Sequence, residues 1–342
     1  MTAAVIGGGG WGTALAIVLA KNGHAVRLWV FEADLAERMR RDRVNERFLP
    51  GVRIPDEIAI TSTLTEAATG AETIVLATPS HVLRETATRL AQAGGETLAA
   101  ARLVVIATKG LERESHHRMS EVVDETLPSP LRKHPVVLAG PSHAEEVARG
   151  IPTAVVAACA DRARAQAAQE MFSNDSFRVY TNDDVIGVEI AVALKNVVAI
   201  AAGISDGLGF GDSTKGALLT RGLAEIARLG EALGARPETF AGLAGMGDLI
   251  ATATSRHSRN RNLGEAIGRG VTLEAALASS PMVAEGVGTA KAAVDLAVRC
   301  GVELPIAAQV CAILFEGKSA REAMRQLLTR DLKPEARTVS RR

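Results

Sequence analysis

The sequence predicts an α/β fold in which a doubly wound, largely parallel sheet is followed by an all-helical region. Short β-branched runs alternate with Ala-rich helical stretches in the first half of the chain, and the β-strand signals stop after about residue 182. The apolar runs are continuous, which is typical of strands that helices cover on both faces. We therefore expect two domains, residues 1–182 and residues 183–342.

The β-branched runs predict strands at residues 3–7, 25–30, 72–79, 102–110, 134–140, 153–159 and 177–181. Helices fit between these runs, for example at residues 11–22, 33–42 and 81–93. Breaks that contain glycine divide the second half into successive helices up to about residue 330. The stretch "TNDD" (181–184) offers N-cap residues for the long apolar helix that follows it.

Composition and charge narrow the class of protein. The chain has 342 residues, of which 47% are hydrophobic, and this is enough for two cores. Lys plus Arg equals Asp plus Glu at 39 each, so the overall charge gives no reason to expect a nucleic acid or an anionic membrane as partner. Cys159, Cys300 and Cys311 are too widely spaced for a disulfide framework or a zinc site, and the histidines show no H-x-x-x-H spacing. Because the N-terminus also lacks the basic region of a signal peptide, we expect a cytoplasmic protein with reduced thiols and no metal.

The stretch "VIGGGGWGTALA" (5–16) carries the strongest local motif. Gly7, Gly9 and Gly12 satisfy G-x-G-x-x-G directly after a predicted strand and at the start of a predicted helix, as in a Rossmann-type domain. Gly7 then permits the tight turn, Gly9 lets the backbone approach a pyrophosphate, and Gly12 lets the helix pack close to the strand.

Glu32 follows the second predicted strand, twenty positions after Gly12. A carboxylate at this offset accepts hydrogen bonds from an adenosine ribose and repels a 2′-phosphate, which favours NAD over NADP. Two alternatives remain. Glu32 is exposed next to a helix start and has no ligand role, or the nearby arginines permit NADP, namely Arg27, Arg38, Arg40 and Arg41.

Polar residues also follow three later strands, at "ATPSH" (77–81), "ATKGL" (107–111) and "AGPSHAEEVA" (139–148). Ligands of doubly wound sheets lie outside the carboxyl ends of the strands, so Lys109 is expected to point into that crevice. Gly140, Pro141 and Ser142 form a turn before a new helix, where Ser142 serves equally well as a helix cap.

The run at residues 185–204 is long enough to cross a membrane, but Glu189, Lys195 and Asn196 inside it would be penalised at a bilayer centre. We expect a buried helix instead. Lys195 lies where the helix is apolar on nearly every face, so it either extends to water or has a function. Burial would lower its pKa towards neutrality, which suits an acid or base that converts a hydroxyl to a carbonyl. The sequence therefore favours Lys195 as the proton acceptor of a hydride-transfer enzyme.

The segment "AGMGDLIATATSRHSRNR" (244–261) is a candidate anion site. It contains Ser258, Arg259 and Asn260, and an arginine with hydroxyl and amide donors beside it suits phosphate recognition. Two alternatives are a solvated basic loop that includes Arg256 and Arg261, and a plain helix-capping role for Asp248.

The chain carries an ordered series of signatures: "GGGGWGTALA" (7–16), "NERFLPGVRIP" (45–55), "ATKGLE" (107–112), "AGPSHAEEVARGIPTA" (139–154), "FRVYTNDDVIGVEIAVALKNVVAIAAGISDGLGFGD" (177–212), "LLTRGLAEIARLG" (218–230), "GLAGMGDL" (242–249), "SRHSRNR" (255–261) and "MVAEGVGTAKAA" (282–293). Together they resemble the bacterial NAD(P)-dependent sn-glycerol-3-phosphate dehydrogenases up to about residue 330. The resemblance implies reversible reduction of dihydroxyacetone phosphate to sn-glycerol 3-phosphate for phospholipid synthesis, and a homodimer without stable membrane insertion.

The resemblance also assigns site residues by position. Lys195 is implied as the proton acceptor for the C2 hydroxyl, with Lys109, Asp248 and Thr252 as the other catalytic positions. Lys109, Lys195 and Asp248 are also implied to bind the substrate, and Lys109 to contact both cofactor and substrate. Arg259 and Asn260 are implied to bind the substrate phosphate, with Gly140, Ser142 and Ser258 completing that pocket. The cofactor positions, besides the three glycines of the motif, are Gly10, Trp11, Phe31, Glu32, Phe48, Lys109, Ala144, Arg259, Val283 and Glu285.

The chain departs from many of these relatives at two places. Gly10 stands where many have a serine, and Phe31 and Glu32 stand where many have a basic pair. Two other functions remain open at this stage: a hydroxyacid dehydrogenase with a Rossmann and a helical domain, and an NAD-binding sensor without catalysis. The "SRNR" segment argues against the first, and the combination of Lys195, Asp248 and Arg259 argues against the second.

Overall fold

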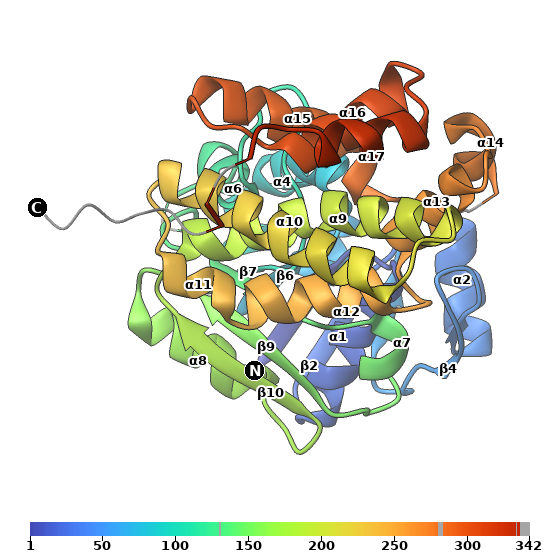
Figure 1. The fold of residues 1–342 in the computed structure, drawn as a ribbon. Coiled ribbons are helices and arrows are strands. Elements are labelled where there is room, and N and C mark those ends of the chain that lie inside the picture. The colour runs from blue at the N-terminus through green and yellow to red at the C-terminus, as the bar shows by residue number, and fades with distance from the viewer. Residues whose placement is uncertain (130, 280–282, 333, 336–342) are drawn as a thin grey trace, which may run out of the picture.

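The computed structural model describes residues 1–129, 131–279, 283–332 and 334–335 (Figure 1). An eight-stranded sheet has the strand order β10-β9-β8-β7-β6-β1-β2-β5. The strands are β1 (Thr2–Ile6), β2 (Ala25–Trp29), β5 (Ala59–Thr61), β6 (Thr73–Leu76), β7 (Leu103–Ile106), β8 (Val136–Ala139), β9 (Thr153–Ala158) and β10 (Phe177–Asn182). Neighbours are parallel except β8 and β9, so the predicted doubly wound, largely parallel sheet is confirmed.

The central strand β1 explains why the apolar runs are continuous. It pairs with β2 on one side and with β6 on the other, and Ala3, Ala4, Val5 and Ile6 are fully buried. Ala3 and Val5 face one helical layer, whereas Ala4 and Ile6 face the other. The four side chains after Thr2 are therefore covered, and no polar alternation is needed.

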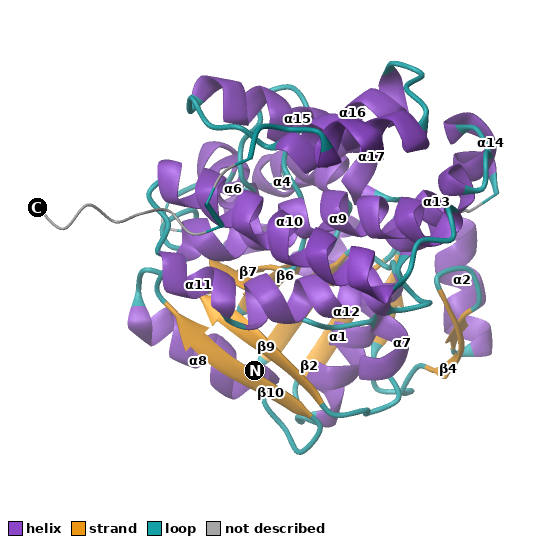
Figure 2. Cartoon of the chain, in the orientation of Figure 1, coloured by secondary structure: helices purple, strands orange, loops and turns teal. Residues whose placement is uncertain are grey.

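Helices cover both faces of the sheet (Figure 2). One face packs against α1 (Gly10–Lys21), α2 (Ala33–Asp42) and α8 (Arg162–Phe172). The other packs against α3 (Leu64–Ala68), α4 (Ser80–Gln92) and α6 (Met119–Thr126). The short helices α5 (Gly95–Leu98) and α7 (Ala144–Val147) complete this half. The predicted helices at 11–22, 33–42 and 81–93 are thus confirmed within one residue at each end.

Two features of this half were not predicted. Strand β5 extends the sheet beyond β2, and β3 (Val44–Asn45) pairs with β4 (Leu49–Arg53) in a separate antiparallel hairpin. In addition, β6 and β7 end three and four residues before the predicted strand ends at 79 and 110. The residues after them form loops, and these loops face the candidate site.

All regular elements after Asn182 in the described part of the chain are helices, as predicted. The central helix is α9 (Val185–Gly207), and around it lie α10 (Asp212–Ala232), α11 (Pro237–Ala241), the π-helix η1 (Leu243–Gly247), α12 (Asp248–Thr254), α13 (Arg259–Gly268), α14 (Leu273–Ala278), α15 (Glu285–Arg299), α16 (Pro305–Phe315) and α17 (Ala320–Leu328). Helices α9 and α13 pack closely because a Cβ at Gly264 would lie 2.1 Å from the carbonyl oxygen of Ile200.

Helix α9 is the run that also has the length and apolarity of a membrane span. Within the described residues it is the one helix that passes this test, and 83% of its most apolar window is buried inside the protein. Its N-cap is Asp184, as the "TNDD" stretch predicts, because the Asp184 carboxylate accepts a hydrogen bond from Gly187 N at 2.9 Å. Val188 and Val192 then pack against the sheet, so α9 joins the two halves of the core.

Candidate active site

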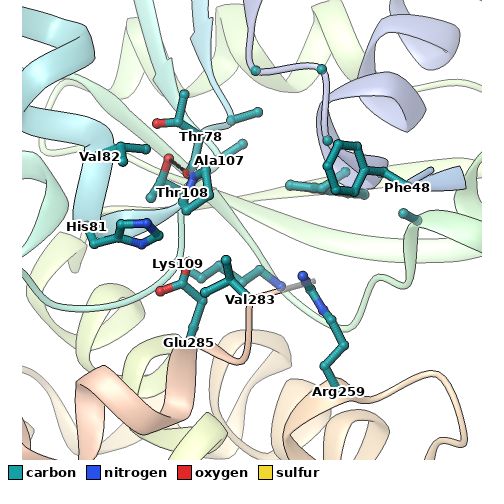
Figure 3. A pocket seen from close by; sticks show the side chains of 18 of the residues that line it. Phe48, Thr78, His81, Val82, Ala107, Thr108, Lys109, Arg259, Val283 and Glu285 are labelled. Atoms are coloured by element: carbon teal, nitrogen blue, oxygen red, sulfur yellow. Dashed lines mark hydrogen bonds between the residues drawn. The ribbon is translucent and has the colours of Figure 1, made fainter. Parts of the chain in front are cut away.

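A cavity of about 500 Å³ lies between the carboxyl ends of the strands and the helical region (Figure 3). Most of the residues that sequence analysis singled out line this cavity: Gly7, Gly9, Gly10, Trp11, Phe31, Glu32, Phe48, Lys109, Ser142, Ala144, Lys195, Thr252, Ser258, Arg259, Asn260, Val283 and Glu285. Gly12, Gly140 and Asp248 are not among the lining residues. They lie behind the wall of the cavity and position the groups that form it.

The glycine turn between β1 and α1 forms one wall. Gly7 has φ +127°, and a Cβ there would lie 2.7 Å from the carbonyl oxygen of Ala77. A Cβ at Gly12 would lie 1.9 Å from the carbonyl oxygen of Gly7, so the turn requires both glycines. A Cβ at Gly9 would meet nothing within 4 Å. Gly9 therefore faces open space, which suits a position reserved for a ligand.

The cavity fits a dinucleotide on further grounds. The indole Nε1 of Trp11 and the hydroxyl of Thr78 are buried and have no hydrogen-bond partner within the described residues. Both residues line the cavity, so these two polar atoms can form hydrogen bonds to a bound dinucleotide. The start of α1 also directs unpaired N–H groups and the positive end of the helix dipole to this wall, which favours a pyrophosphate.

Loops after β6, β7 and β8 bring further groups to the site. Figure 3 shows Thr78, Thr108 and Lys109 from two of these loops, together with Val283 and Glu285. The Glu285 carboxylate accepts a hydrogen bond from Ser80 N at 3.1 Å and one from the Ser80 hydroxyl, so it caps α4 and connects α15 to the sheet.

The "AGPSH" turn after β8 holds Lys109 in place. Gly140 has φ +141°, and its carbonyl oxygen accepts hydrogen bonds from Lys109 Nζ and from the Ser142 hydroxyl, both at 3.0 Å. Ser142 does not cap α7, because His143 occupies the N-cap position. The alternative in which Ser142 is a helix cap is therefore wrong.

A buried charge cluster lies at the centre of the site. Lys195 of α9 donates hydrogen bonds to the Asp248 carboxylate and, at 2.7 Å, to the Thr252 hydroxyl. The other Asp248 oxygen accepts a hydrogen bond from Lys109 Nζ at 3.0 Å. Lys195 is 5% exposed and Asp248 is 1% exposed. Asp248 is thus a shared partner of two lysines, and the alternative in which it only caps α12 is wrong, since Gly247 stands at the N-cap.

The surroundings shift both pKa values in this cluster. Burial lowers the pKa of Lys195 to about 7, although the negative charge of Asp248 opposes the shift, and the nearby positive charge of Lys109 adds to it. Burial acts to raise the pKa of Asp248, but Lys109 and Lys195 outweigh this effect and the net pKa is lowered. At neutral pH the site therefore holds a carboxylate beside an amine that can gain or lose a proton.

The π-helix η1 delivers Asp248 to this cluster. It comprises the five residues "LAGMG" and ends directly before Asp248. A Cβ at Gly245 would lie 2.0 Å from the carbonyl oxygen of Phe240, so the wide turn requires a glycine there. Such π-turns interrupt α-helices most often at functional sites. The "AGMGD" stretch indicated an important acid, but sequence spacing did not predict the π-turn.

The candidate anion site lies at the start of α13. Arg259 is exposed, lines the cavity and forms no ion pair or hydrogen bond with another side chain in the described part of the protein. Arg261 is instead paired with Asp206 at 2.7 Å and Glu265 at 3.2 Å, and Arg256 is exposed outside the cavity. Only one arginine of this segment is thus available to a ligand in the cavity.

Asn260 and Ser258 serve mainly to hold this segment. The Asn260 amide donates to Asn196 Oδ1 at 3.0 Å and its oxygen accepts from Gly286 N at 2.9 Å, so it ties α13 to α9 and α15. Ser258 caps α13 by accepting a hydrogen bond from Arg261 N at 3.3 Å. Their side chains still line the cavity beside Arg259.

Sequence analysis did not single out several other lining residues. His143 and His257 line the cavity with ring centroids 6.0 Å apart, and burial lowers the pKa of His143. Both stand inside the quoted stretches 139–148 and 244–261, but no spacing signal marked them. Arg47 and Arg89 also line the cavity, Arg47 beside Glu32 and Arg89 beside the rings of Trp29 and Phe31.

Hydride exchange with a nicotinamide requires a bound dinucleotide and a group that exchanges a proton with the substrate oxygen. The glycine turn and Lys195 line one cavity and can supply these two functions, so the fold and site together define a nucleotide-dependent dehydrogenase. The match to family models is specific: residues 2–165 match the N-terminal part and residues 184–325 the C-terminal part of NAD-dependent glycerol-3-phosphate dehydrogenase. The chain belongs to this family, as the sequence signatures predict.

Individual relatives agree over almost the whole length. A Geobacter sulfurreducens protein named glycerol-3-phosphate dehydrogenase (NAD(P)+) is 52% identical over 97% of this chain and 98% of its own. A Geobacillus thermodenitrificans protein of the same name is 50% identical over 97% of this chain and 95% of its own. The crystal structure of glycerol-3-phosphate dehydrogenase from Coxiella burnetii superposes with a TM-score of 0.91 at 38% identity, and it covers 96% of this chain and 99% of that one.

Proposed function

We propose that the protein interconverts dihydroxyacetone phosphate and sn-glycerol 3-phosphate, with NADH or NADPH as the hydride donor for the reduction. The observation that carries this proposal is that Lys195 and Arg259 line the cavity that begins at the glycine turn. Asp248 lies behind Lys195 and accepts a hydrogen bond from it, and Arg259 has no side-chain partner among the described residues. The names of the relatives, all glycerol-3-phosphate dehydrogenases, support the same substrate pair.

The glycine turn, Trp11 and Thr78 are the groups that would hold the dinucleotide, which supplies the hydride when it is bound. Lys195 Nζ exchanges the proton of the substrate C2 oxygen: as the ammonium it donates this proton during reduction, and as the neutral amine it accepts it during oxidation. A pKa of about 7 keeps both forms accessible near neutral pH. Asp248 and Thr252 orient the amine, since both accept hydrogen bonds from it.

Lys109 has a different task in this proposal. Its ammonium is held by Asp248 and the Gly140 carbonyl at the edge of the cavity. From there it would contact both substrate and cofactor. A fixed positive charge near the reacting oxygen stabilises negative charge that develops there. Asp248 therefore serves both lysines, as a hydrogen-bond acceptor for the proton-exchanging amine and for the electrostatic group.

Arg259 is proposed to bind the substrate phosphate. The start of α13, whose N-terminal N–H groups favour anions, adds to the positive potential at this end of the cavity. Asn260 and Ser258 provide amide and hydroxyl groups beside it. The engagement of Asn260 with Asn196 and Gly286 gives it a fixed orientation for this contact.

Four further points belong to the proposal. We place the domain division at residues 182 and 183, which is supported by separate family matches that end at 165 and begin at 184. We propose a homodimer, a cytoplasmic location and a role in supplying glycerol 3-phosphate for phospholipid synthesis, on the basis of family membership.

The direct test follows NADH and NADPH oxidation with dihydroxyacetone phosphate. We expect turnover by the wild type and a loss of at least about a hundredfold in Lys195→Met, because general acid catalysis contributes this much. Arg259→Ala should lower kcat/KM for dihydroxyacetone phosphate about a hundredfold but should change the weak rate with unphosphorylated dihydroxyacetone little, because only the phosphate contact is lost.

Arg256→Ala is the matched control, since Arg256 lies three residues before Arg259 and is exposed outside the cavity. No turnover of dihydroxyacetone phosphate by the wild type would overturn the proposed reaction. Equal losses with both substrates in Arg259→Ala would remove the phosphate-binding role from Arg259.

A further inference from the structure

The adenosine end of the cavity contains more charge than Glu32 alone. Glu32 stands at the N-cap position of α2 and lines the cavity. Arg47, from the turn of the β3–β4 hairpin, forms an ion pair with it at 3.3 Å, and the Arg47 guanidinium lies 4.9 Å from the centre of the Phe48 ring. An acid at this place is the group that meets the adenosine ribose, and a nearby arginine is what accommodates a 2′-phosphate. Arg47 therefore stands where a 2′-phosphate would be received.

The hairpin that carries Arg47 is attached to the glycine turn. Asn45 is fully buried and donates hydrogen bonds to the Gly8 carbonyl at 2.8 Å and to the Thr13 hydroxyl at 2.9 Å. Its Oδ1 accepts a hydrogen bond from Phe48 N at 3.1 Å. One side chain thus ties the hairpin turn to the pyrophosphate turn, so the backbone of Arg47 has a defined position relative to the nucleotide site.

A second arginine lies at the same end. The Arg89 guanidinium, from α4, lies 5.7 Å from the Trp29 ring centre and 5.9 Å from that of Phe31. Arg89 lines the cavity and forms no ion pair with a residue of the described chain. Phe31 also lines the cavity and is 65% exposed, so its ring is accessible to a ligand at this end.

The arginines that sequence proximity suggested for NADP have other partners. Arg38 is paired with Asp34 and Arg41 with Asp42, both at 2.8 Å, and Arg27 donates to the Thr69 carbonyl. Neither these three nor Arg40 line the cavity. The positive charge available to a 2′-phosphate therefore comes from Arg47 and Arg89.

We propose that Arg47, assisted by Arg89, is the 2′-phosphate-binding group that lets this cavity accept NADPH in spite of Glu32. In this inference, which rests on the cavity being the proposed cofactor site, Arg47 pairs with Glu32 when NADH is bound and with the 2′-phosphate when NADPH is bound. The side chains of Arg47 and Glu32 are 46% and 33% exposed, and exposed ion pairs of this kind contribute little to stability. Exchange of the partner therefore costs little.

The experiment measures dissociation constants of NADH and NADPH from the fluorescence of the bound nicotinamide, without substrate and therefore without turnover. Arg47→Ala should raise the dissociation constant of NADPH about tenfold, since one charge-assisted contact to phosphate is lost, and should change that of NADH less than about threefold. Arg89→Ala should show the same selectivity with a smaller effect. Arg38→Ala is the matched control, because this arginine lies on α2 outside the cavity, and it should change neither constant.

Glu32→Gln completes the test. Removing the carboxylate should strengthen NADPH binding several-fold in the wild-type background, and this gain should shrink in Arg47→Ala, because the released arginine is then absent. If Arg47→Ala changes both constants equally or changes neither, the inference is overturned. If neither nucleotide binds the wild type, the proposed cofactor site itself fails, and this outcome is distinct from a loss of selectivity.

Discussion

The pKa of Lys195 can be shifted in opposite directions by two substitutions around one carboxylate. Burial lowers this pKa from its ordinary value of 10.5 to about 7. The difference corresponds to roughly 5 kcal/mol in favour of the neutral amine. At pH 7 about half of the enzyme then has a neutral Lys195, compared with roughly one molecule in 3,000 for an ordinary lysine. Oxidation of glycerol 3-phosphate requires this neutral form, so its rate should report the titration directly.

Asp248→Asn removes the charge that opposes the effect of burial. The Asp248 carboxylate raises the pKa of Lys195, and the asparagine keeps the size and one acceptor oxygen. The pKa of Lys195 should therefore fall below 7. Lys109→Met removes a positive charge that lowers the pKa of Lys195, so in this variant the pKa should rise. Shifts of about one pH unit are expected for charges at hydrogen-bond distance from the same carboxylate.

The assay is the pH profile of kcat/KM for glycerol 3-phosphate oxidation between pH 5.5 and 9.5. In the wild type kcat/KM should rise about tenfold per pH unit below 7 and level off above it, because only the neutral amine accepts the proton. The rising part of the profile should move to lower pH in Asp248→Asn and to higher pH in Lys109→Met, even if the maximal rate of either variant is reduced. The phosphate of the substrate titrates equally in all variants, so differences between profiles belong to the enzyme. If kcat/KM rises over the same pH range in all three proteins, the assignment of this titration to Lys195 is refuted.

Two further predictions concern other parts of the chain. Gly12→Ala should unfold the turn or the domain, because its Cβ would lie 1.9 Å from the Gly7 carbonyl oxygen. Gly9→Ala should keep the wild-type melting temperature, because its Cβ enters open space in the cavity. This variant should instead lose nucleotide affinity. Equal melting temperatures for the two variants would contradict this division of roles. Glu225, which accepts hydrogen bonds from Ile306 N and Ala307 N at the start of α16, has a pKa raised by burial from 4.5 to about 7. Between pH 4.5 and pH 7 the folded protein therefore keeps Glu225 protonated, whereas the unfolded chain does not. The free energy of unfolding should fall by roughly 3 kcal/mol as the pH rises through this range. Glu225→Gln cannot titrate, so its free energy of unfolding should not show this decrease. Urea unfolding should therefore show the variant to be more stable, relative to the wild type, at pH 8 than at pH 5. An equal difference in stability at the two pH values would contradict the prediction.

The strands could be predicted because burial on both faces requires a continuous apolar run, which is visible in the local sequence. Residues Ala3–Ile6 of β1 each lie in one or the other core, so this run had to be apolar throughout. The β3–β4 hairpin has no such local sequence pattern. Its stability depends on Asn45, whose partners Gly8 and Thr13 lie more than thirty residues away in the sequence. A polar residue that binds a distant backbone carbonyl cannot be distinguished by spacing from one in a solvated loop.

The same distinction holds for the site. Lys195 could be singled out because a lysine in an apolar run conflicts with its own surroundings, and this conflict is visible in the sequence. Its partners were harder to see: Asp248 meets it through a π-turn that no periodicity predicted. The arginine next to Glu32 was missed altogether, because Arg38 and Arg41 are closer in sequence but have acidic neighbours of their own.

The two departures from the family pattern, at Gly10 and at Phe31 and Glu32, both lie beside the β3–β4 hairpin. Gly10 stands where many relatives have a serine, and a Cβ at this position would lie 2.5 Å from the Phe48 carbonyl oxygen. The missing side chain lets the hairpin turn approach the start of α1, and the Asn45 hydrogen bonds hold it there. The same turn brings Arg47 to Glu32, the residue that replaces a basic position of many relatives. A basic group absent from the end of β2 is thus supplied from the hairpin, and the glycine at position 10 is what makes room for it.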